Sequence, residues 1–140
     1  MRIEHQFSIA GFEVSVSFPD GWDADTLLPS FRPFYGKKEG QEKALLKCTV
    51  CTSVENKAAM PSGELIENTL SDMGYVSLYK EAEGYCVTLS AEQGGTLHVM
   101  QADRRFSTVR VYLHEEDKRA GHALSSLLRI AYSQAVLYWD

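Results

Sequence analysis

The sequence predicts an α+β fold: a two-layer domain in which a mostly antiparallel sheet of about six or seven strands packs against one long C-terminal helix. Short runs of alternating apolar and polar residues recur along most of the chain, a pattern typical of half-buried strands. The final stretch, His114–Asp140, instead has apolar residues at three- and four-residue steps, the spacing of one helix face. Because a sheet must bury its apolar face, we expect this stretch to cover it.

The first two alternating runs predict an N-terminal hairpin. In Ile3–Ile9 and in Phe12–Phe18 every second residue lies on one face, and these residues are apolar except for His5. Ala10 and Gly11 lie between the runs, and glycine's access to positive φ lets two residues close such a turn.

The middle of the chain contains one clear strand and one ambiguous segment. Ala44–Val54 is rich in strand formers and places Leu46, Cys48 and Val50 on one face, which predicts a third strand. Glu64–Leu70 is compatible with a strand or with a turn of helix, and the pattern leaves both open.

From Tyr75 onward the pattern predicts a meander of strands joined by short polar connections. Each run has one strongly apolar face, formed in turn by Tyr85, Val87 and Leu89, by Leu97 and Val99, and by Val109, Val111 and Leu113. This assignment puts His98 and Cys86 on the less buried face of the sheet.

The predicted helix divides into two halves. In the first half, Leu124, Leu127 and Leu128 lie on the stripe expected to face the sheet. From Ile130 onward, apolar residues spread round the whole circumference, and such a helix needs cover on all sides. We therefore expect the last residues to cover a neighbouring domain or a second copy of the chain.

Two residues of that tail, Leu137 and Trp139, are the candidates for such a contact.

At the other end of the helix, the acidic residues Glu115–Asp117 suit the positive end of a helix dipole.

Length and composition suit a single domain spanning residues 1–140. A net charge of −5 and a pI near 5.4 oppose binding to nucleic acid. No run approaches the roughly 18 apolar residues of a membrane span, and the first residues lack the continuous apolar core of a signal peptide. The three cysteines form no even disulfide framework, which favours reduced thiols and a cytoplasmic location.

The sequence predicts no metal site, although two spacings suggest one. Cys48 and Cys51 form a C-x-x-C, but residues three apart in a strand point to opposite faces and cannot readily share a metal. His114 and His122 are separated by more than about 10 Å along an α-helix, too far to bind one ion.

Catalytic chemistry is not predicted either, and we expect neither an enzyme nor a cofactor. A Cys86–His98 nucleophile pair is conceivable on neighbouring strands, but no recognisable orienting group or oxyanion-hole motif accompanies it. The chain contains no G-x-x-x-x-G-K-[ST] phosphate loop, and so lacks the usual site for nucleotide phosphates.

One aromatic cluster is a candidate contact surface. Phe31, Arg32, Phe34 and Tyr35 combine a guanidinium with aromatic rings, a composition suited to gripping a ligand or a protein partner. The same side chains are equally suited to packing at the edge of the sheet.

Several segments together carry a family resemblance. They are FSIAGFEVSVSFP near the start, LLPSFRPF at residues 27–34, GYCVTLS with GGTLHVMQADRRFSTVRVYL, and the final ALSSLLRIAYSQAVLYWD. In region and order, these segments resemble the N-terminal region of proteins related to HPr kinase/phosphorylase, the phosphoenolpyruvate carboxykinase-like group of Bacteroides and relatives. In such proteins a comparable helix leads into a strand and a GKSGTGKST-like phosphate loop, where nucleotide binding and phosphoryl transfer would occur.

The resemblance implies a non-catalytic N-terminal domain of an HPr-kinase-like P-loop phosphotransferase, with a scaffold, regulatory or partner-docking role. Its expected partner is a following kinase-like domain or a second copy of the chain. The alternative is a free-standing module that binds a small ligand or a protein through the aromatic cluster or an exposed sheet face. No family catalytic residue transfers to any position, because the phosphate loop is not part of this sequence.

Overall fold

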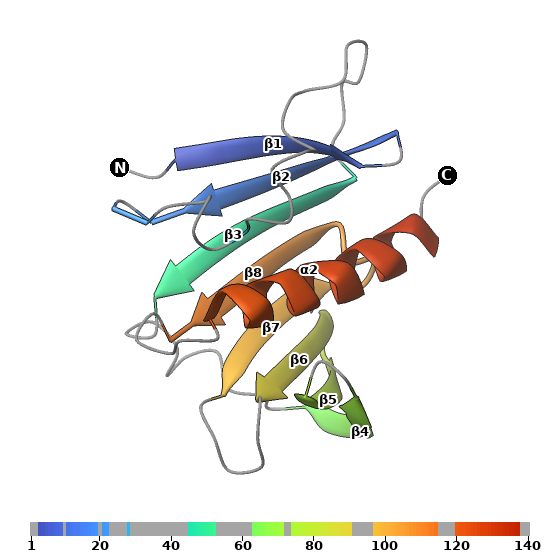
Figure 1. Cartoon of the computed structure of the whole chain (residues 1–140). Helices are drawn as coiled ribbons and strands as arrows, with labels where there is room; N and C mark the ends of the chain where they lie inside the picture. Colours follow the sequence, from blue (N-terminus) through green and yellow to red (C-terminus); the bar gives the residue numbers. More distant parts are fainter. Residues whose placement is uncertain are drawn as a thin grey trace.

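The computed structural model describes residues 3–9, 11–19, 21–22, 28, 45–52, 63–71, 74–90, 97–114 and 120–137. The elements in these ranges are β1 (Ile3–Ile9), β2 (Phe12–Phe18), β3 (Leu46–Thr52), β4 (Glu64–Ser71), β5 (Gly74–Glu81), β6 (Gly84–Ser90), β7 (His98–Asp103), β8 (Thr108–Leu113) and α2 (Ala120–Leu137). The described strands form one eight-stranded sheet in the order β1-β2-β3-β8-β7-β6-β5-β4, and α2 lies across one of its faces (Figure 1).

The predicted α+β class is confirmed, with more strands than the six or seven expected. The additional strand is β4, which covers the segment whose pattern left strand and helix open. It pairs with β5 in antiparallel register, with Ser71 opposite Gly74, which has a φ of 114°. A helix in this segment would lose the backbone pairing with β5. The neighbouring strand β5, and not local propensity, therefore determines that the segment is a strand.

The sheet is antiparallel except at β3, which runs parallel to both of its neighbours, β2 and β8. Two blocks thus meet at β3: the N-terminal hairpin on one side and the meander β4–β8 on the other. The hairpin turn behaves as predicted, with Gly11 at a φ of 87° and Ile9 opposite Phe12. Positive φ at this turn is accessible to glycine at little steric cost.

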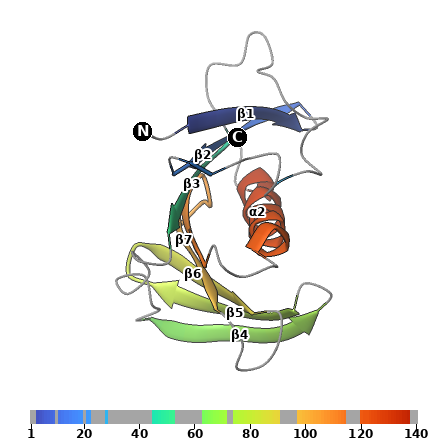
Figure 2. The same cartoon turned by 60° about the vertical axis from the view of Figure 1, so that its left-hand side comes forward.

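The main core lies between the sheet and α2, and Figure 2 shows the sheet curving around the helix. The predicted stripe residues Leu124, Leu127 and Leu128 are all buried there. The strand residues that meet them include Val14, Val16, Leu46, Cys48, Val50, Val87, Leu89, Val109, Val111 and Leu113. The faces predicted for these strands are therefore confirmed.

The second half of α2 finds more cover within this chain than the sequence suggested. The Tyr132 hydroxyl donates a hydrogen bond of 2.9 Å to the Ile9 carbonyl, and its ring meets Phe12 edge-on at 6.4 Å between centroids. Val136 also packs against the core. The β1–β2 hairpin thus covers Tyr132, one of the apolar residues beyond the predicted stripe.

The predicted face of His98 is wrong, whereas Cys86 lies on the predicted face, although it is buried there. His98 is only 2% exposed and lies opposite Leu89, on the face that α2 covers. Cys86 lies opposite Gln101 on the other face, where Cys51, Val99 and Tyr112 join it in a second buried cluster. Since apolar residues occur at both parities along β7, alternation alone could not identify its core face.

Candidate functional site

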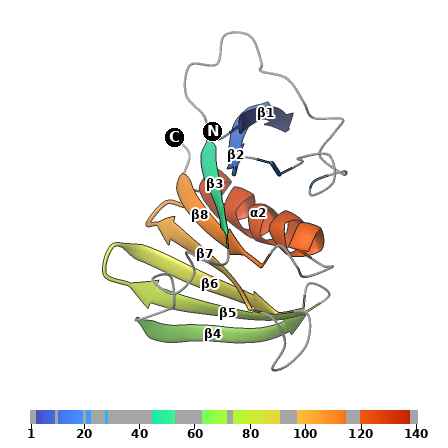
Figure 3. The same ribbon diagram turned by 90° about the vertical axis from the view of Figure 1, so that its left-hand side faces the viewer.

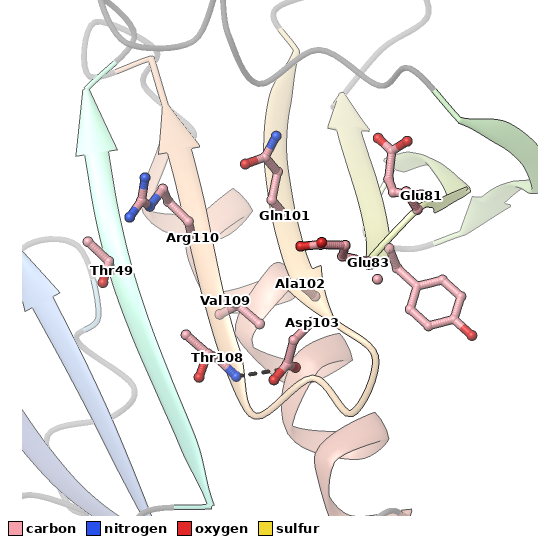
Figure 4. Close-up of a pocket in the computed structure, with 12 residues that line it drawn as sticks. Thr49, Glu81, Glu83, Gln101, Ala102, Asp103, Thr108, Val109 and Arg110 are labelled. Carbon is pink, nitrogen blue, oxygen red and sulfur yellow. Dashed lines mark hydrogen bonds between the residues drawn. The ribbon is translucent and has the colours of Figure 1, made fainter.

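The described residues form a polar groove of about 470 Å³ on the face of the sheet opposite α2 (Figure 4). The polar side chains that line it include Thr49, Glu81, Glu83, Gln101, Thr108 and Arg110. They come from β3, β8, β7, the last residue of β5 and the β5–β6 turn, so the groove crosses the sheet at the end where two hairpin turns lie.

Strand register explains why these side chains meet. Arg110 on β8 lies opposite both Thr49 on β3 and Gln101 on β7, so the three form a row across the sheet. Partners in adjacent strands share a face, and their Cβ atoms are separated by about 5 Å. Figure 4 shows Glu81 and Glu83 on the β5–β6 side of this row.

Glycine shapes the floor of the groove. Gly84 lies opposite Asp103 on β7 and opposite Glu81 on β5, two positions that carry carboxylates. A Cβ at Gly84 would collide with the Ala102 carbonyl oxygen. The glycine therefore permits close approach of the strands and leaves the hollow unfilled.

Asp103 has a structural role at one side of the groove. Its carboxylate accepts hydrogen bonds from the Ser107 backbone N–H at 2.8 Å and from the Ser107 hydroxyl at 2.7 Å. These bonds hold the β7–β8 turn, in which Phe106 has a φ of 57° and stacks on Tyr85 at 5.4 Å between centroids. Positive φ is uncommon for an aromatic residue, and the side-chain bonds to the turn help to stabilise it.

The chemistry of the groove suits binding more than catalysis. Arg110 provides a guanidinium, Glu81 and Glu83 provide carboxylates, and Gln101 provides an amide. Burial, together with a smaller contribution from the charge of Glu81, raises the pKa of the nearby Cys86 thiol to about 12. That thiol stays protonated at neutral pH and is a poor nucleophile.

The two thiols of the C-x-x-C lie on opposite faces of β3, as predicted. Cys48 belongs to the core beneath α2, whereas Cys51 belongs to the cluster on the other face. In the part of the chain that the structure describes, no group of three or more His, Cys, Asp or Glu side chains is arranged to hold a metal ion.

His114 lies beside His98, a neighbour that the sequence did not indicate. His98 Nδ1 accepts a hydrogen bond of 3.3 Å from the His114 backbone N–H, and the two rings meet edge-on at 5.8 Å between centroids. His122 lies exposed on α2. His98 and Cys86 occupy opposite faces of the sheet, so they cannot form the nucleophile pair considered above.

A second surface of interest is the edge strand β4, which sequence reasoning missed. Every side chain from Glu64 to Leu70 is exposed, including the large apolar Leu65, Ile66 and Leu70. β4 ends the strand order, at the opposite edge from β1 (Figure 3). The sequence contains no clear signal for this surface, because Ile66 and Leu70 are four residues apart, a spacing compatible with one face of a helix and with one face of a strand.

Most of the contact residues predicted from sequence lie outside the described residues: Phe31, Arg32, Phe34, Tyr35 and Trp139. Leu137 is described, and it is 74% exposed at the last residue of α2. The acidic residues Glu115–Asp117 also lie outside the described ranges.

Comparisons with protein-family models, with curated proteins and with solved structures find no match for this chain. Among the described residues, no helix combines the length and the apolar character needed to cross a membrane.

Proposed function

We propose that this chain is a non-catalytic, partner-docking domain whose contact surface is the edge strand β4. The observation that supports this proposal is the exposure of three large apolar side chains, Leu65, Ile66 and Leu70, on one strand at the end of the sheet. Edge strands offer backbone hydrogen-bonding groups to other chains, and natural proteins usually protect them with charge, bulges or cover. An edge that combines such groups with an apolar surface suits recognition of an extended segment.

β4 also carries features that limit indiscriminate pairing. The strand has an irregular register between Leu65 and Glu67, and the carboxylates of Glu64 and Glu67 lie along it. Bulges and charges of this kind discourage edge-to-edge aggregation. Because these features lie beside exposed apolar residues, β4 is better suited to a selective contact than to nonspecific association.

The resemblance to HPr-kinase-like proteins supports a narrower form of the proposal. In this form the chain is the N-terminal domain of a cytoplasmic P-loop phosphotransferase and docks on its kinase-like core. The core performs phosphoryl transfer, and the present domain positions or regulates it. A separately produced kinase-like core should form a one-to-one complex with this chain in sedimentation experiments, and failure to do so removes the narrower form.

The docking function is tested by hydrogen–deuterium exchange of the whole chain with peptides selected on it from a random library. Bound peptides should slow exchange of the backbone amides in β4, because a paired edge exchanges less. Leu70→Lys should abolish the effect. Leu137→Lys is the matched control, since Leu137 is also exposed and apolar but lies on α2. Protection confined to other segments, or peptide binding that Leu70→Lys leaves unchanged, would contradict the proposal.

The groove supports a second candidate function, the binding of a small ligand with charges of both signs. Arg110 and the carboxylates of Glu81 and Glu83 line the same hollow, so it offers complementary groups for an anionic and a cationic end. Screening of zwitterionic metabolites by thermal shift, with Arg110→Gln as the comparison, tests this candidate.

A further inference from the structure

We infer that the segment recognised by β4 is an extended strand that alternates apolar and basic residues and pairs with Glu67–Ser71. This inference rests on the proposed docking function and specifies the chemistry of its partner. It depends on three features of β4: its regular stretch, the difference between its two faces, and its lack of positive charge.

The regular part of the strand defines where a partner can pair. Glu67, Asn68, Thr69, Leu70 and Ser71 pair with β5 in continuous register, from Leu78 back to Gly74. The irregularity falls on the other side of Glu67, between Leu65 and Glu67. Since a bulge disrupts the ladder locally, an added strand finds its regular set of backbone groups along Glu67–Ser71.

The two faces of this stretch differ in chemistry. Asn68 and Leu70 share the face opposite α2, and the Asn68 side-chain oxygen accepts a 3.1 Å hydrogen bond from the Ser77 hydroxyl on β5. Glu67 and Thr69 share the other face, where the Thr69 hydroxyl donates to the Glu67 carboxylate at 3.2 Å. One face therefore presents an apolar side chain that is 66% exposed, and the other presents a carboxylate.

An added strand continues both faces, because paired residues in neighbouring strands point to the same side. Its side chains beside Leu70 gain from being apolar. Those beside Glu67 gain from being cationic, since opposite charges across a strand pair stabilise it and like charges oppose it. Successive residues in a strand alternate between faces, so the favoured partner alternates apolar residues with lysine or arginine.

A second copy of the chain fits this surface poorly. β4 has the sequence ELIENTLS, which contains two glutamates and no lysine or arginine. Pairing of two β4 strands would supply no cation from that strand to Glu64 or Glu67. Each copy also carries a net charge of −5, which adds long-range repulsion. A basic partner would place cations beside these glutamates and would be attracted by the net negative charge of the chain.

The test uses three fluorescent peptides of equal length in binding measurements with the whole chain. One alternates valine and lysine, one alternates valine and glutamate, and one has the lysine peptide's composition with its lysines grouped at one end. We expect the alternating lysine peptide to bind at least tenfold more tightly than either of the others, and its binding to weaken with added salt.

Charge reversal on the chain gives the matched comparison. Glu67→Lys should reverse the preference in favour of the glutamate peptide. Glu4→Lys changes the net charge equally, but Glu4 is an exposed residue of β1 at the opposite edge of the sheet. The Glu4→Lys variant should therefore prefer the alternating lysine peptide, as the parent chain does. Both positions are exposed, and unchanged thermal melts will verify that the variants fold.

The outcomes separate this inference from the docking function. If the lysine and glutamate peptides bind equally well and both slow exchange of the β4 amides, the inference about charge is overturned while docking stands. If neither peptide binds and the chain alone forms a dimer with protected β4 amides, a second copy occupies the edge and the inference is overturned. If library-selected peptides also leave β4 unprotected, the docking function itself fails.

Discussion

The two outer hairpins of the sheet, β1–β2 and β4–β5, have the same antiparallel topology but opposite surroundings. In the first, Phe7 on the edge strand β1 is 0% exposed, and α2 reaches the turn through Tyr132. In the second, all side chains from Glu64 to Leu70 on the edge strand β4 are exposed. The two hairpins thus differ in burial and not in strand pairing, and α2 packs mainly against the four strands that lie between them, β3, β8, β7 and β6.

This comparison teaches that one edge strand of a sheet can contribute side chains to the core while the other edge strand exposes its side chains to solvent. β1 contributes to stability because its inward side chains complete the layer beneath α2. β4 has little such burial, so its apolar residues are available to another chain at small cost to the fold. The following predictions test this division, beginning with the largest expected effect.

Phe7→Ala should destabilise the domain by about 3–5 kcal/mol, because a fully buried aromatic side chain on β1 is replaced by a cavity. Urea denaturation followed by circular dichroism measures the change. A loss below about 1 kcal/mol would place β1 with β4 as a surface strand and would break the comparison.

Leu127→Ala should cost about 2–5 kcal/mol, since Leu127 is fully buried on the face of α2 that packs on the sheet. The same denaturation experiment applies, with Arg129→Ala on the exposed side of α2 as the control. Equal effects of the two substitutions would show that the helix is not the layer that holds the hairpin and meander together.

Tyr132→Phe should cost about 1 kcal/mol, because it removes the hydrogen bond to the Ile9 carbonyl while keeping the ring against Phe12. Burial raises the pKa of Tyr132 above its ordinary value of 10.0. The hydroxyl's contribution is therefore fully present below about pH 10 and is lost as the pH rises through the higher value of the folded state. Melts of both proteins between neutral and alkaline pH should converge, and a constant difference would contradict this account.

Leu70→Ser should change the free energy of unfolding by no more than about 0.5 kcal/mol, since the side chain is 66% exposed on β4. The same substitution should weaken binding of the alternating valine–lysine peptide. A stability loss comparable to that of Phe7→Ala would mean that β4 belongs to the core, and the contrast between the two hairpins would disappear.

Much of the fold follows from local patterns. The period of two along β1, β2, β3, β6 and β8 correctly identified the buried faces, and the three- and four-residue spacing of Leu124, Leu127 and Leu128 identified the buried stripe of α2. Gly11 marked the first turn. These features are encoded within a few residues, because side-chain direction in a strand or helix follows directly from its backbone period.

The candidate site was much less predictable. The row of Thr49, Arg110 and Gln101 exists because β3 pairs in parallel with β8, and these strands are far apart in the sequence. Periodicity indicates which residues of one strand share a face, but it carries no information about which strand lies beside it. The groove and its charges were therefore beyond the reach of single-segment patterns.

The sequence by itself determined the strand-forming segments, the N-terminal turn and the amphipathic helix, since each depends on short-range backbone geometry and side-chain spacing. Only the tertiary structure decided that His98 is buried beneath α2 and that β4 is exposed. In both cases the deciding quantity is the position of another element: apolar residues occur at both parities of β7, and those of β4 lie beyond the area that α2 covers. Burial is a property of the assembled layers, because it depends on which surfaces exclude water together.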